Sequence, residues 1–242
     1  MIASRKFEPG LYAASVDVSL QAIADRVNRR RLYYDAREYL RARVERLDLA
    51  PNRALGAIFV HIPKCGGTSV ENQIGVFHGH RSAIYFRAAD RAFFAQAFKF
   101  TLVRNPYDRL VSGFHYLKHH ATAPLDRAWV ARTLGGISDF QEFAEALEDP
   151  AFACRVTAWK HFVPQWYFVC DGRGGPMMDL VGRIEDFDAF VTEVARRSAV
   201  RLQNEVHRAS ARRPWQDYYS ARAKAAVVAL YREDFRAFGY AE

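Results

Sequence analysis

One short segment of the chain combines a lysine, two glycines and two hydroxyl side chains directly after an apolar run. It is HIPKCGGTS, from His61 to Ser69, and it lies between LGAIFV and VENQIGVF. A β-branched apolar run that breaks into a glycine-containing turn and then resumes with helical spacing predicts a strand, a tight loop and a helix. Because the first turn of a helix has backbone N–H groups without intrahelical partners, such a loop is typical of an anion-binding site.

A second segment of similar chemical character is TLVRNPYDRLVSGFHYL, from Thr101 to Leu117. A predicted strand ends in Arg104, Pro106 fits the first turn of a new helix, and Ser112 follows further along that helix. An arginine at the carboxyl end of a parallel strand lies at the edge where α/β sheets bind ligands, and its planar fork suits a phosphate. A salt bridge to Asp108 is the alternative role for this arginine. Together the two segments predict a ligand with two anionic groups, such as a nucleotide with 5′ and 3′ groups.

The elements that must position these residues alternate between strands and helices. We expect strands near residues 57–61, 83–86, 98–103 and 178–184, and helices near residues 67–77, 90–97 and 218–235. Strands separated by helices at these spacings indicate an α/β fold with a parallel sheet covered on both faces. The glycine-rich stretch between Cys170 and Asp179 is expected to be a surface turn.

The N-terminal part of the chain is rich in arginine. Between Leu20 and Leu47 apolar residues recur at helical intervals, among them Tyr33, Leu40 and Val44, while arginines fill the other faces. This pattern predicts a solvated basic helix, or a helix pair, packed on the core; an oligomer contact or a clamp for an anionic acceptor are the alternatives. We therefore expect a basic helical extension over residues 1–54 and one domain over residues 55–242.

The composition of the chain bears on its ligands and on its location in the cell. The chain has 242 residues, half of them hydrophobic, and a formal net charge of +8, which favours acidic ligands without choosing among them. Three widely spaced cysteines, Cys65, Cys154 and Cys170, show no CxxC spacing, so a reducing, cytoplasmic location is expected. No stretch approaches the roughly 18 to 20 apolar residues of a membrane span, and the N-terminus lacks the apolar core of a signal peptide. We expect no integral membrane segment.

The two segments resemble motifs of a known family. HIPKCGGTS is similar to the 5′-phosphosulfate loop, and LVRNPYDRLVSGF to the 3′-phosphate motif, of sulfotransferases that use 3′-phosphoadenylyl sulfate. The resemblance is to the carbohydrate-type branch related to heparan sulfate 2-O-sulfotransferase. It continues in order through FHGHRSAIYF, HFVPQ, VGRIEDFDAF and LYREDFRAFGY. It implies a P-loop-like, three-layer α/β fold, and the lack of an anchor and of disulfides resembles a soluble bacterial member.

The resemblance also implies roles for individual residues. Lys64 would bridge the transferring sulfuryl group and the leaving phosphate, His80 matches the general base, and His78 matches a supporting residue. The 5′-phosphate would be held by Cys65, Gly66, Gly67, Thr68 and Ser69, and the 3′-phosphate by Arg104 and Ser112. The arginine cluster of HRASARRPW would cover the nucleotide with Arg208, Arg212 and Arg213. The co-substrate would be 3′-phosphoadenylyl sulfate, and no metal is expected because a sulfuryl group carries less charge than a phosphoryl group.

Other functions remain open at this point. A P-loop kinase or NTPase is disfavoured because its Walker loop has the lysine after the last glycine, whereas here Lys64 precedes both glycines. A nucleic-acid-binding module is disfavoured because the basic residues are mixed with acids along the chain. A nucleotide sensor without catalysis would keep the same fold. The expected partner is a hydroxyl acceptor on a carbohydrate or glycolipid, with a homo-oligomer compatible with the sequence.

Overall fold

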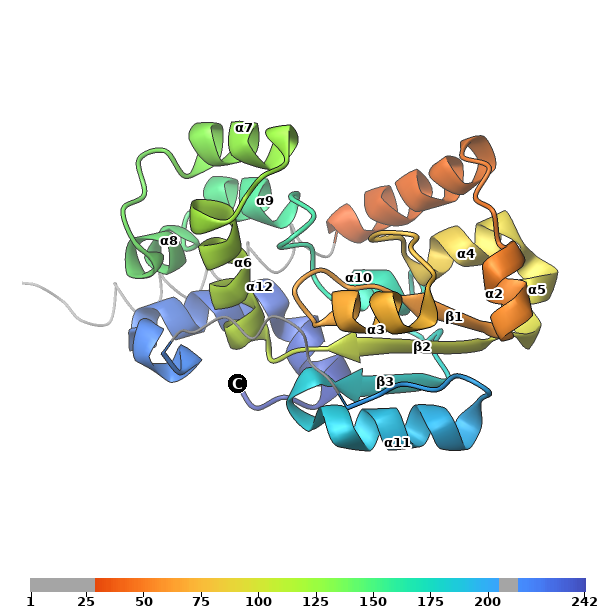
Figure 1. Ribbon diagram of the computed structural model, residues 1–242. Coiled ribbons are helices and arrows are strands. Elements are labelled where there is room, and N and C mark those ends of the chain that lie inside the picture. Colours follow the sequence, from red (N-terminus) through yellow and green to blue (C-terminus); the bar gives the residue numbers. More distant parts are fainter. Residues whose placement is uncertain (1–28, 205–212) are drawn as a thin grey trace, which may run out of the picture.

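A parallel sheet organises the fold. The computed structural model describes residues 29–204 and 213–242. Among these residues, β1 (Ala57–Val60), β2 (Phe98–Val103) and β3 (Leu180–Arg183) form a three-stranded sheet in the order β1-β2-β3, with both pairings parallel. Helices lie along the sheet and beyond its carboxyl edge (Figure 1). The α/β class and the helix-flanked parallel sheet expected from the sequence are confirmed.

The helices form three groups along the chain, one for each strand. Around β1 are α2 (Ala50–Leu55), α3 (Gly67–Ile74), α4 (Ala83–Ala89) and α5 (Arg91–Gln96). Between β2 and β3 lie α6 (Pro106–His119), α7 (Pro124–Thr133), α8 (Phe140–Ala146), α9 (Pro150–Thr157) and α10 (Trp166–Val169). After β3 come η1 (Ile184–Asp186), α11 (Phe187–Arg197), η2 (Trp215–Tyr218) and α12 (Ala221–Phe238). A further helix covers residues 29–44.

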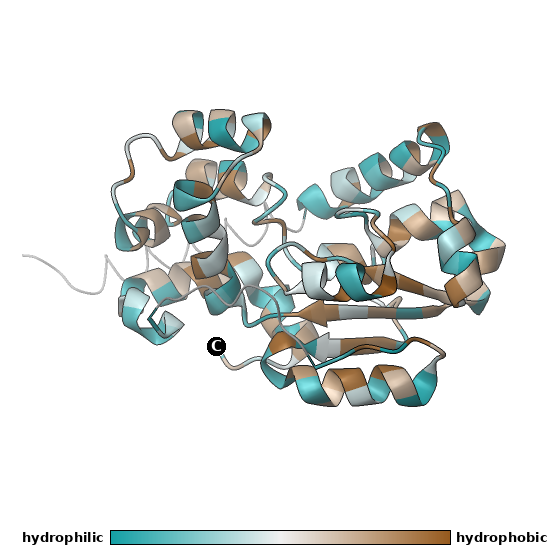
Figure 2. Ribbon diagram, in the orientation of Figure 1, coloured by the Kyte–Doolittle hydropathy of each residue, from teal (hydrophilic) through white to brown (hydrophobic). Residues whose placement is uncertain are grey.

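The core is centred on the sheet. All four residues of β1 are buried, as expected of a parallel strand covered on both faces. The ring of Phe100 on β2 lies 5.2 Å from that of Phe59 and 6.1 Å from that of Phe190, so aromatic packing joins β1, β2 and α11. Hydrophobic residues follow the strands, and polar residues follow the outward face of α11 (Figure 2).

The observed bounds of the helices and strands agree with some of the expected elements and contradict one. The strand expected at residues 98–103 is β2, and α5 begins at Arg91 after Asp90, whose side chain caps it. The strand expected at residues 83–86 is wrong, because these residues open α4. The hydroxyl of Ser82 accepts a hydrogen bond from the Tyr85 N–H, which starts that helix. Burial of four consecutive residues produced an apolar run that resembles a strand in sequence.

The helix over residues 29–44 packs through a different face than its apolar spacing suggested. Tyr33, Leu40 and Val44 are 74%, 61% and 81% exposed. Arg31 and Glu38, in contrast, are buried, with exposed fractions of 2% and 0%. The guanidinium of Arg31 donates to the carbonyls of Trp166 and Cys170 and pairs with Asp35. The expectation that the apolar residues of this helix pack on the core is therefore wrong for these three positions, since polar contacts hold the buried face.

Candidate functional site

The loop after β1 has an unusual backbone. Lys64 has a φ of 68°, and it is the non-glycine residue with positive φ among those described. This conformation costs an L-residue roughly 1–2 kcal/mol. Two arginines of the neighbouring corner hold it, since Arg109 Nε donates to the Pro63 carbonyl at 2.9 Å and Arg104 Nη1 donates to the Lys64 carbonyl at 3.2 Å. Because C=O and N–H point oppositely across a trans peptide, the N–H groups of Lys64 and Cys65 face away from those arginines.

Helix α3 follows this loop directly. Its N-cap is Gly66, with a φ of 77°, and neither a side-chain cap nor an acidic residue occupies its first turn. Thr68 is exposed and Ser69 is buried. The start of α3 therefore offers backbone donors and a positive dipole end next to Lys64, which is the arrangement that binds a phosphate or phosphosulfate oxygen.

Packing explains both glycines of the loop. A Cβ on Gly67 would lie 2.1 Å from Cδ2 of His61, and one on Gly66 would lie 2.4 Å from Cδ1 of Ile184. The His61 ring is itself held by Glu71, with 2.8 Å between Nδ1 and Oε2. His61 therefore braces the first turn of α3, and the close approach of backbone to ring requires glycine.

Replacing Gly67 with alanine is expected to lower the free energy of unfolding by about 1–3 kcal/mol, because the new methyl group overlaps the buried His61 ring. Chemical denaturation measures this change. Gly136→Ala is the matched control, since a Cβ there would have no atom within 4 Å and the φ is not positive. Equal stability of both variants would show that His61 moves aside without cost.

The second corner begins where β2 ends. Arg104 Nε lies 2.6 Å from Oδ2 of Asp108, so the salt bridge considered from the sequence is present, while the same guanidinium reaches the Lys64 carbonyl. Arg104 thus joins the two corners directly. Ser112 lies on α6 and is 9% exposed. This corner therefore holds a half-buried guanidinium just before α6, the helix that carries Ser112, and a guanidinium suits a second anionic group.

Gln165 was not identified from the sequence as a site residue, although it lies in HFVPQ. Its Oε1 accepts the Arg104 N–H at 2.9 Å, and its Nε2 donates to the Arg104 carbonyl at 2.8 Å. Its own N–H donates to the fully buried Asp234 at 2.9 Å. Because this side-chain amide bonds both the N–H and the carbonyl of Arg104, it fixes the end of β2. The two residues are 61 positions apart in the sequence, so this role of Gln165 can be recognised only in the folded chain.

The thiol of Cys65 points into the core. Its Sγ lies 3.1 Å from Oε1 of Gln165, and burial raises the pKa of this thiol to about 12. At neutral pH the sulfur is therefore a protonated, buried group. Cys65 can contribute to an anion site through its backbone N–H.

His80 lies against the loop with a defined tautomer. Its Nδ1 is 3.2 Å from the carbonyl oxygen of His61, and because a carbonyl can only accept, Nδ1 carries the proton. Nε2 of neutral His80 then holds the lone pair. Burial lowers the pKa of His80 to about 3, with further lowering by His61, His161 and Lys160. The ring is consequently neutral at physiological pH, as a general base must be.

A chain of ring contacts links Lys64 to His80 through Tyr116 and His161. Lys64 Nζ lies 4.2 Å from the Tyr116 ring centroid, that ring lies 5.0 Å from His161, and His161 lies 6.4 Å from His80. His161, in the HFVPQ segment, is buried. The segments involved come from four separate parts of the chain, so Tyr116 had no signal in the sequence.

His161 is held by an aspartate that the sequence did not single out. Nε2 of His161 lies 3.4 Å from Oδ2 of Asp126, whose Oδ1 lies 3.1 Å from Lys160 Nζ. Burial lowers the pKa of His161 to about 4, although Asp126 opposes this change. With Nε2 directed at the carboxylate, Nδ1 is buried without a hydrogen-bond partner among the described residues.

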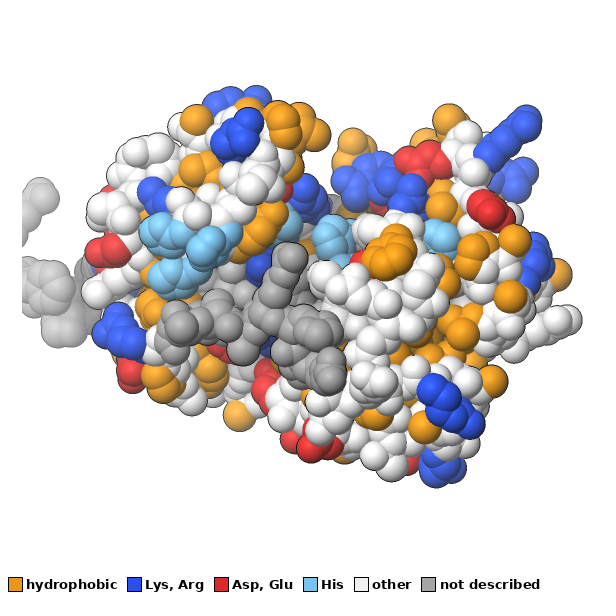
Figure 3. All heavy atoms as spheres, viewed as in Figure 1, with side chains coloured by type: hydrophobic (Ala, Val, Ile, Leu, Met, Phe, Trp, Pro, Cys, Tyr) orange, Lys and Arg blue, Asp and Glu red, His pale blue; other side chains and the backbone are white. Residues whose placement is uncertain are grey.

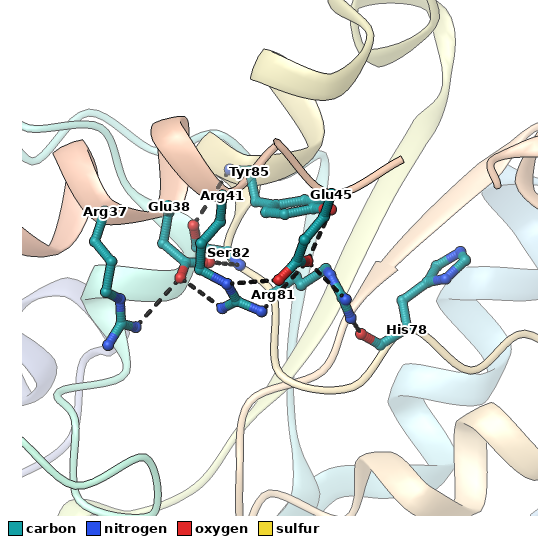
Figure 4. Close-up of polar contacts among 8 residues, drawn as sticks. All are labelled: Arg37, Glu38, Arg41, Glu45, His78, Arg81, Ser82 and Tyr85. Carbon is teal, nitrogen blue, oxygen red and sulfur yellow. Dashed lines mark hydrogen bonds and ion pairs between the residues drawn. The ribbon is translucent and has the colours of Figure 1, made fainter. Parts of the chain in front are cut away.

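His78 occupies a bracing position beside His80. Its Nε2 contacts Oδ1 of Asn52, and its carbonyl accepts a hydrogen bond from Arg81. Arg81 also donates to Oε2 of Glu45 at 2.9 Å, which ties the segment to the helix over residues 29–44 (Figure 4). Burial, followed by Arg81, lowers the pKa of His78. The ring Nε2 and the backbone carbonyl of His78 thus both help to hold the segment in place.

The remaining expected site residues lie at the edge of this arrangement or outside it. Arg208 and Arg212 fall outside the described residues. Arg213 lies over the ring of Tyr218 at 4.9 Å. Glu185, in the VGRIEDFDAF segment, accepts from the Asn105 N–H at 2.7 Å and from the Tyr240 hydroxyl at 2.9 Å.

Over residues 29–204 and 213–242, no cluster of three or more His, Cys, Asp or Glu side chains could hold a metal ion. The cysteines Cys65, Cys154 and Cys170 are unpaired. None of the helices in the described part of the chain is long and apolar enough to span a bilayer.

The surface is hollowed between α7 and the helix over residues 29–44, with histidine and Lys or Arg side chains along the hollow (Figure 3).

A glycine loop, a lysine and an uncapped helix start at the carboxyl edge of a parallel sheet define a protein of the P-loop-like α/β class. The sulfotransferase family model matches residues 52–241, and the chain belongs to that family. Its reaction class is therefore sulfuryl transfer to an acceptor substrate. No curated protein and no solved structure matched the chain.

Proposed function

We propose that this protein transfers the sulfuryl group of 3′-phosphoadenylyl sulfate to a hydroxyl group of a carbohydrate or glycolipid. The observation that carries the proposal is the direct bond between the two anion-binding corners, in which Arg104 donates to the Lys64 carbonyl at 3.2 Å. This contact places a guanidinium and an uncapped helix start at one sheet edge, as a nucleotide with 5′ and 3′ anionic groups requires. The ring contacts that connect Lys64 with His80 support chemistry at the 5′ end.

Each residue would act on a different charge. The backbone N–H groups at the start of α3 bind the 5′-phosphate, and Arg104 with Ser112 binds the 3′-phosphate. Lys64 stabilises the negative charge that grows on the bridging oxygen as the sulfur–oxygen bond to the nucleotide breaks. His80 Nε2 accepts the proton of the acceptor hydroxyl while its oxygen forms the new bond to sulfur. His61 fixes the required tautomer through its carbonyl, and His78 holds the backbone beside the base.

The proposal includes a cellular location for the enzyme and an entry route for the acceptor. Buried, unpaired cysteines such as Cys65 and Cys170 are compatible with a reducing compartment, and we place the enzyme in the cytoplasm. The acceptor would enter the hollow between α7 and the helix over residues 29–44. A transfer assay with labelled donor and cell-envelope fractions identifies the acceptor class.

Binding of 3′-phosphoadenosine 5′-phosphate is expected to raise the melting temperature more than AMP or ATP does at equal concentration, because it engages both corners. Thermal shift measurements test this. In Arg104→Ala the advantage over AMP should disappear, whereas Arg222→Ala, on α12 and paired with Glu148, should retain it. Equal shifts for all three nucleotides in the unmodified protein would refute the two-corner arrangement.

A further inference from the structure

The outward face of the helix over residues 29–44 is both apolar and basic. Its large exposed side chains are Leu32 at 71%, Tyr33 at 74%, Tyr39 at 51%, Leu40 at 61% and Val44 at 81%. The exposed arginines of the same helix are Arg29, Arg37 and Arg43. Solvent-facing helix surfaces are ordinarily polar, so five large hydrophobic side chains on one short helix need an explanation.

The acidic residues of this helix, Asp35 and Glu38, turn toward the protein, whereas Glu45, directly after the helix, lines the outer pocket with a side chain that is 38% exposed. Glu38 is fully buried and accepts from the Ser82 N–H at 3.2 Å and from Arg41 at 2.9 Å (Figure 4). Glu45 pairs with Arg81 at 2.9 Å, and Asp35 pairs with Arg31 at 2.8 Å. The inner face therefore holds Asp35 and Glu38, and the outer face combines apolar groups with the exposed Arg29 and Arg43 and with Arg37, which pairs with Glu38 at 3.2 Å.

The inner contacts also fix which face is presented. Arg31 donates to backbone carbonyls at the end of α10, and Glu38 accepts from the backbone at the start of α4. Rotating the helix to bury Leu40 and Val44 would expose these buried charges and leave both backbone sites without partners. The outer face additionally carries a shallow pocket lined by residues that include Tyr33, Leu40 and Val44. The helix lies before the stretch matched by the sulfotransferase family, residues 52–241.

We propose that this face docks the protein on the surface of an anionic lipid bilayer. Leucine, valine and tyrosine side chains can enter the headgroup region while the arginines contact lipid phosphates, which is how basic amphipathic helices bind at an interface. Charge decides against a second copy of the chain, because two such faces would place arginine against arginine. A soluble polyanion would use the arginines but leave the apolar side chains in water. The proposal concerns binding and is independent of the reaction proposed above.

Vesicle flotation of the full chain tests the proposal. Vesicles of phosphatidylglycerol and phosphatidylcholine are expected to carry the protein upward, and vesicles of phosphatidylcholine alone are expected to bind it much more weakly. Raising the salt concentration should weaken binding, because the arginine contribution is screened. No nucleotide or acceptor is present, so the result does not depend on the transferase activity.

Matched variants locate the binding face. The double variant Leu40→Ser and Val44→Ser is expected to lower the partition coefficient by more than about tenfold, because the apolar insertion is lost. Arg43→Gln should lower it by about fivefold, the equivalent of one basic residue near an anionic surface. Leu125→Ser and Arg132→Gln, equivalent changes to exposed residues of α7, are expected to leave binding unchanged. All affected side chains are exposed, so circular dichroism melts should be unaltered.

Several results would overturn the proposal. These are no flotation with anionic vesicles, equal binding to both vesicle compositions, or equal losses in the α7 controls. Sedimentation showing a dimer that dissociates in the Leu40→Ser and Val44→Ser variant, without vesicle binding, would assign the face to a second copy. Binding to heparin that is insensitive to the apolar substitutions, again without vesicle binding, would assign it to a soluble polyanion.

Discussion

Replacing His80 with alanine is expected to lower kcat by roughly 10² to 10⁴ while leaving the affinity for 3′-phosphoadenosine 5′-phosphate nearly unchanged. Nδ1 of His80 is occupied by the His61 carbonyl at 3.2 Å, which leaves Nε2 as the basic atom. Its removal eliminates the proton acceptor and one hydrogen bond to the His61 carbonyl, while the N–H donors at the start of α3 and Arg104, which bind the nucleotide, stay in place. Steady-state kinetics and nucleotide-dependent thermal shifts measure the two quantities separately.

The pH dependence provides a second readout for His80. The ordinary pKa of a histidine is about 6.5, but burial and the neighbouring His61, His161 and Lys160 lower that of His80 to about 3. A neutral base loses activity as the pH falls through its pKa, so kcat/KM should stay flat from neutral pH down past 6.5. Bound anionic donor favours the imidazolium, so the acidic limb of kcat should lie at higher pH than that of kcat/KM.

Two variants separate His80 from its neighbours. His78→Ala should reduce kcat less than His80→Ala does, because the His78 ring contacts Asn52 and acts by holding the segment. Turnover and a pH profile close to those of the unmodified protein in His80→Ala would show that another group is the base. His161 would then be the next candidate, since Asp126 orients its ring and Nδ1 is left available.

Local patterns predicted the elements that carry the site. The apolar strand β2, Pro106 at the start of α6 and the glycine loop before α3 depend on short-range preferences, and each lies where the sequence places it. The expected strand at residues 83–86 was wrong because an apolar run without alternation is equally compatible with a buried helix. The capping hydroxyl of Ser82 was the signal that could have identified α4.

The contacts that complete the site come from distant parts of the chain. Gln165 on Arg104, Arg109 on Pro63 and Asp126 on His161 each join residues more than 30 positions apart. No periodicity or local motif encodes such pairs, so they could be found only in the folded chain. The same holds for the helix over residues 29–44, where buried polar contacts outweigh apolar spacing. Its exposed face could not be predicted because the hydrophobic pattern alone favours the opposite orientation.

Replacing Lys64 with alanine is expected to lower kcat by roughly a hundredfold or more, with a smaller change in nucleotide affinity. The ammonium group acts on charge that develops as the sulfur–oxygen bond breaks, so its loss should raise the barrier more than it weakens ground-state binding. Lys64→Arg should recover little, since a planar, delocalised guanidinium does not place a compact point charge at the position of the ammonium group. Single-turnover kinetics at saturating donor measure the effect.

The backbone of Lys64 allows a sharper control. With a φ of 68°, the residue stores strain that glycine does not experience, so Lys64→Gly should have a higher melting temperature than Lys64→Ala. Both variants lack the ammonium group and should share the same loss of turnover. If Lys64→Gly were instead as active as the unmodified protein, the loop conformation alone would suffice and the ammonium would have no catalytic role. A collapse of nucleotide affinity with normal turnover at saturation would make Lys64 a ground-state phosphate ligand.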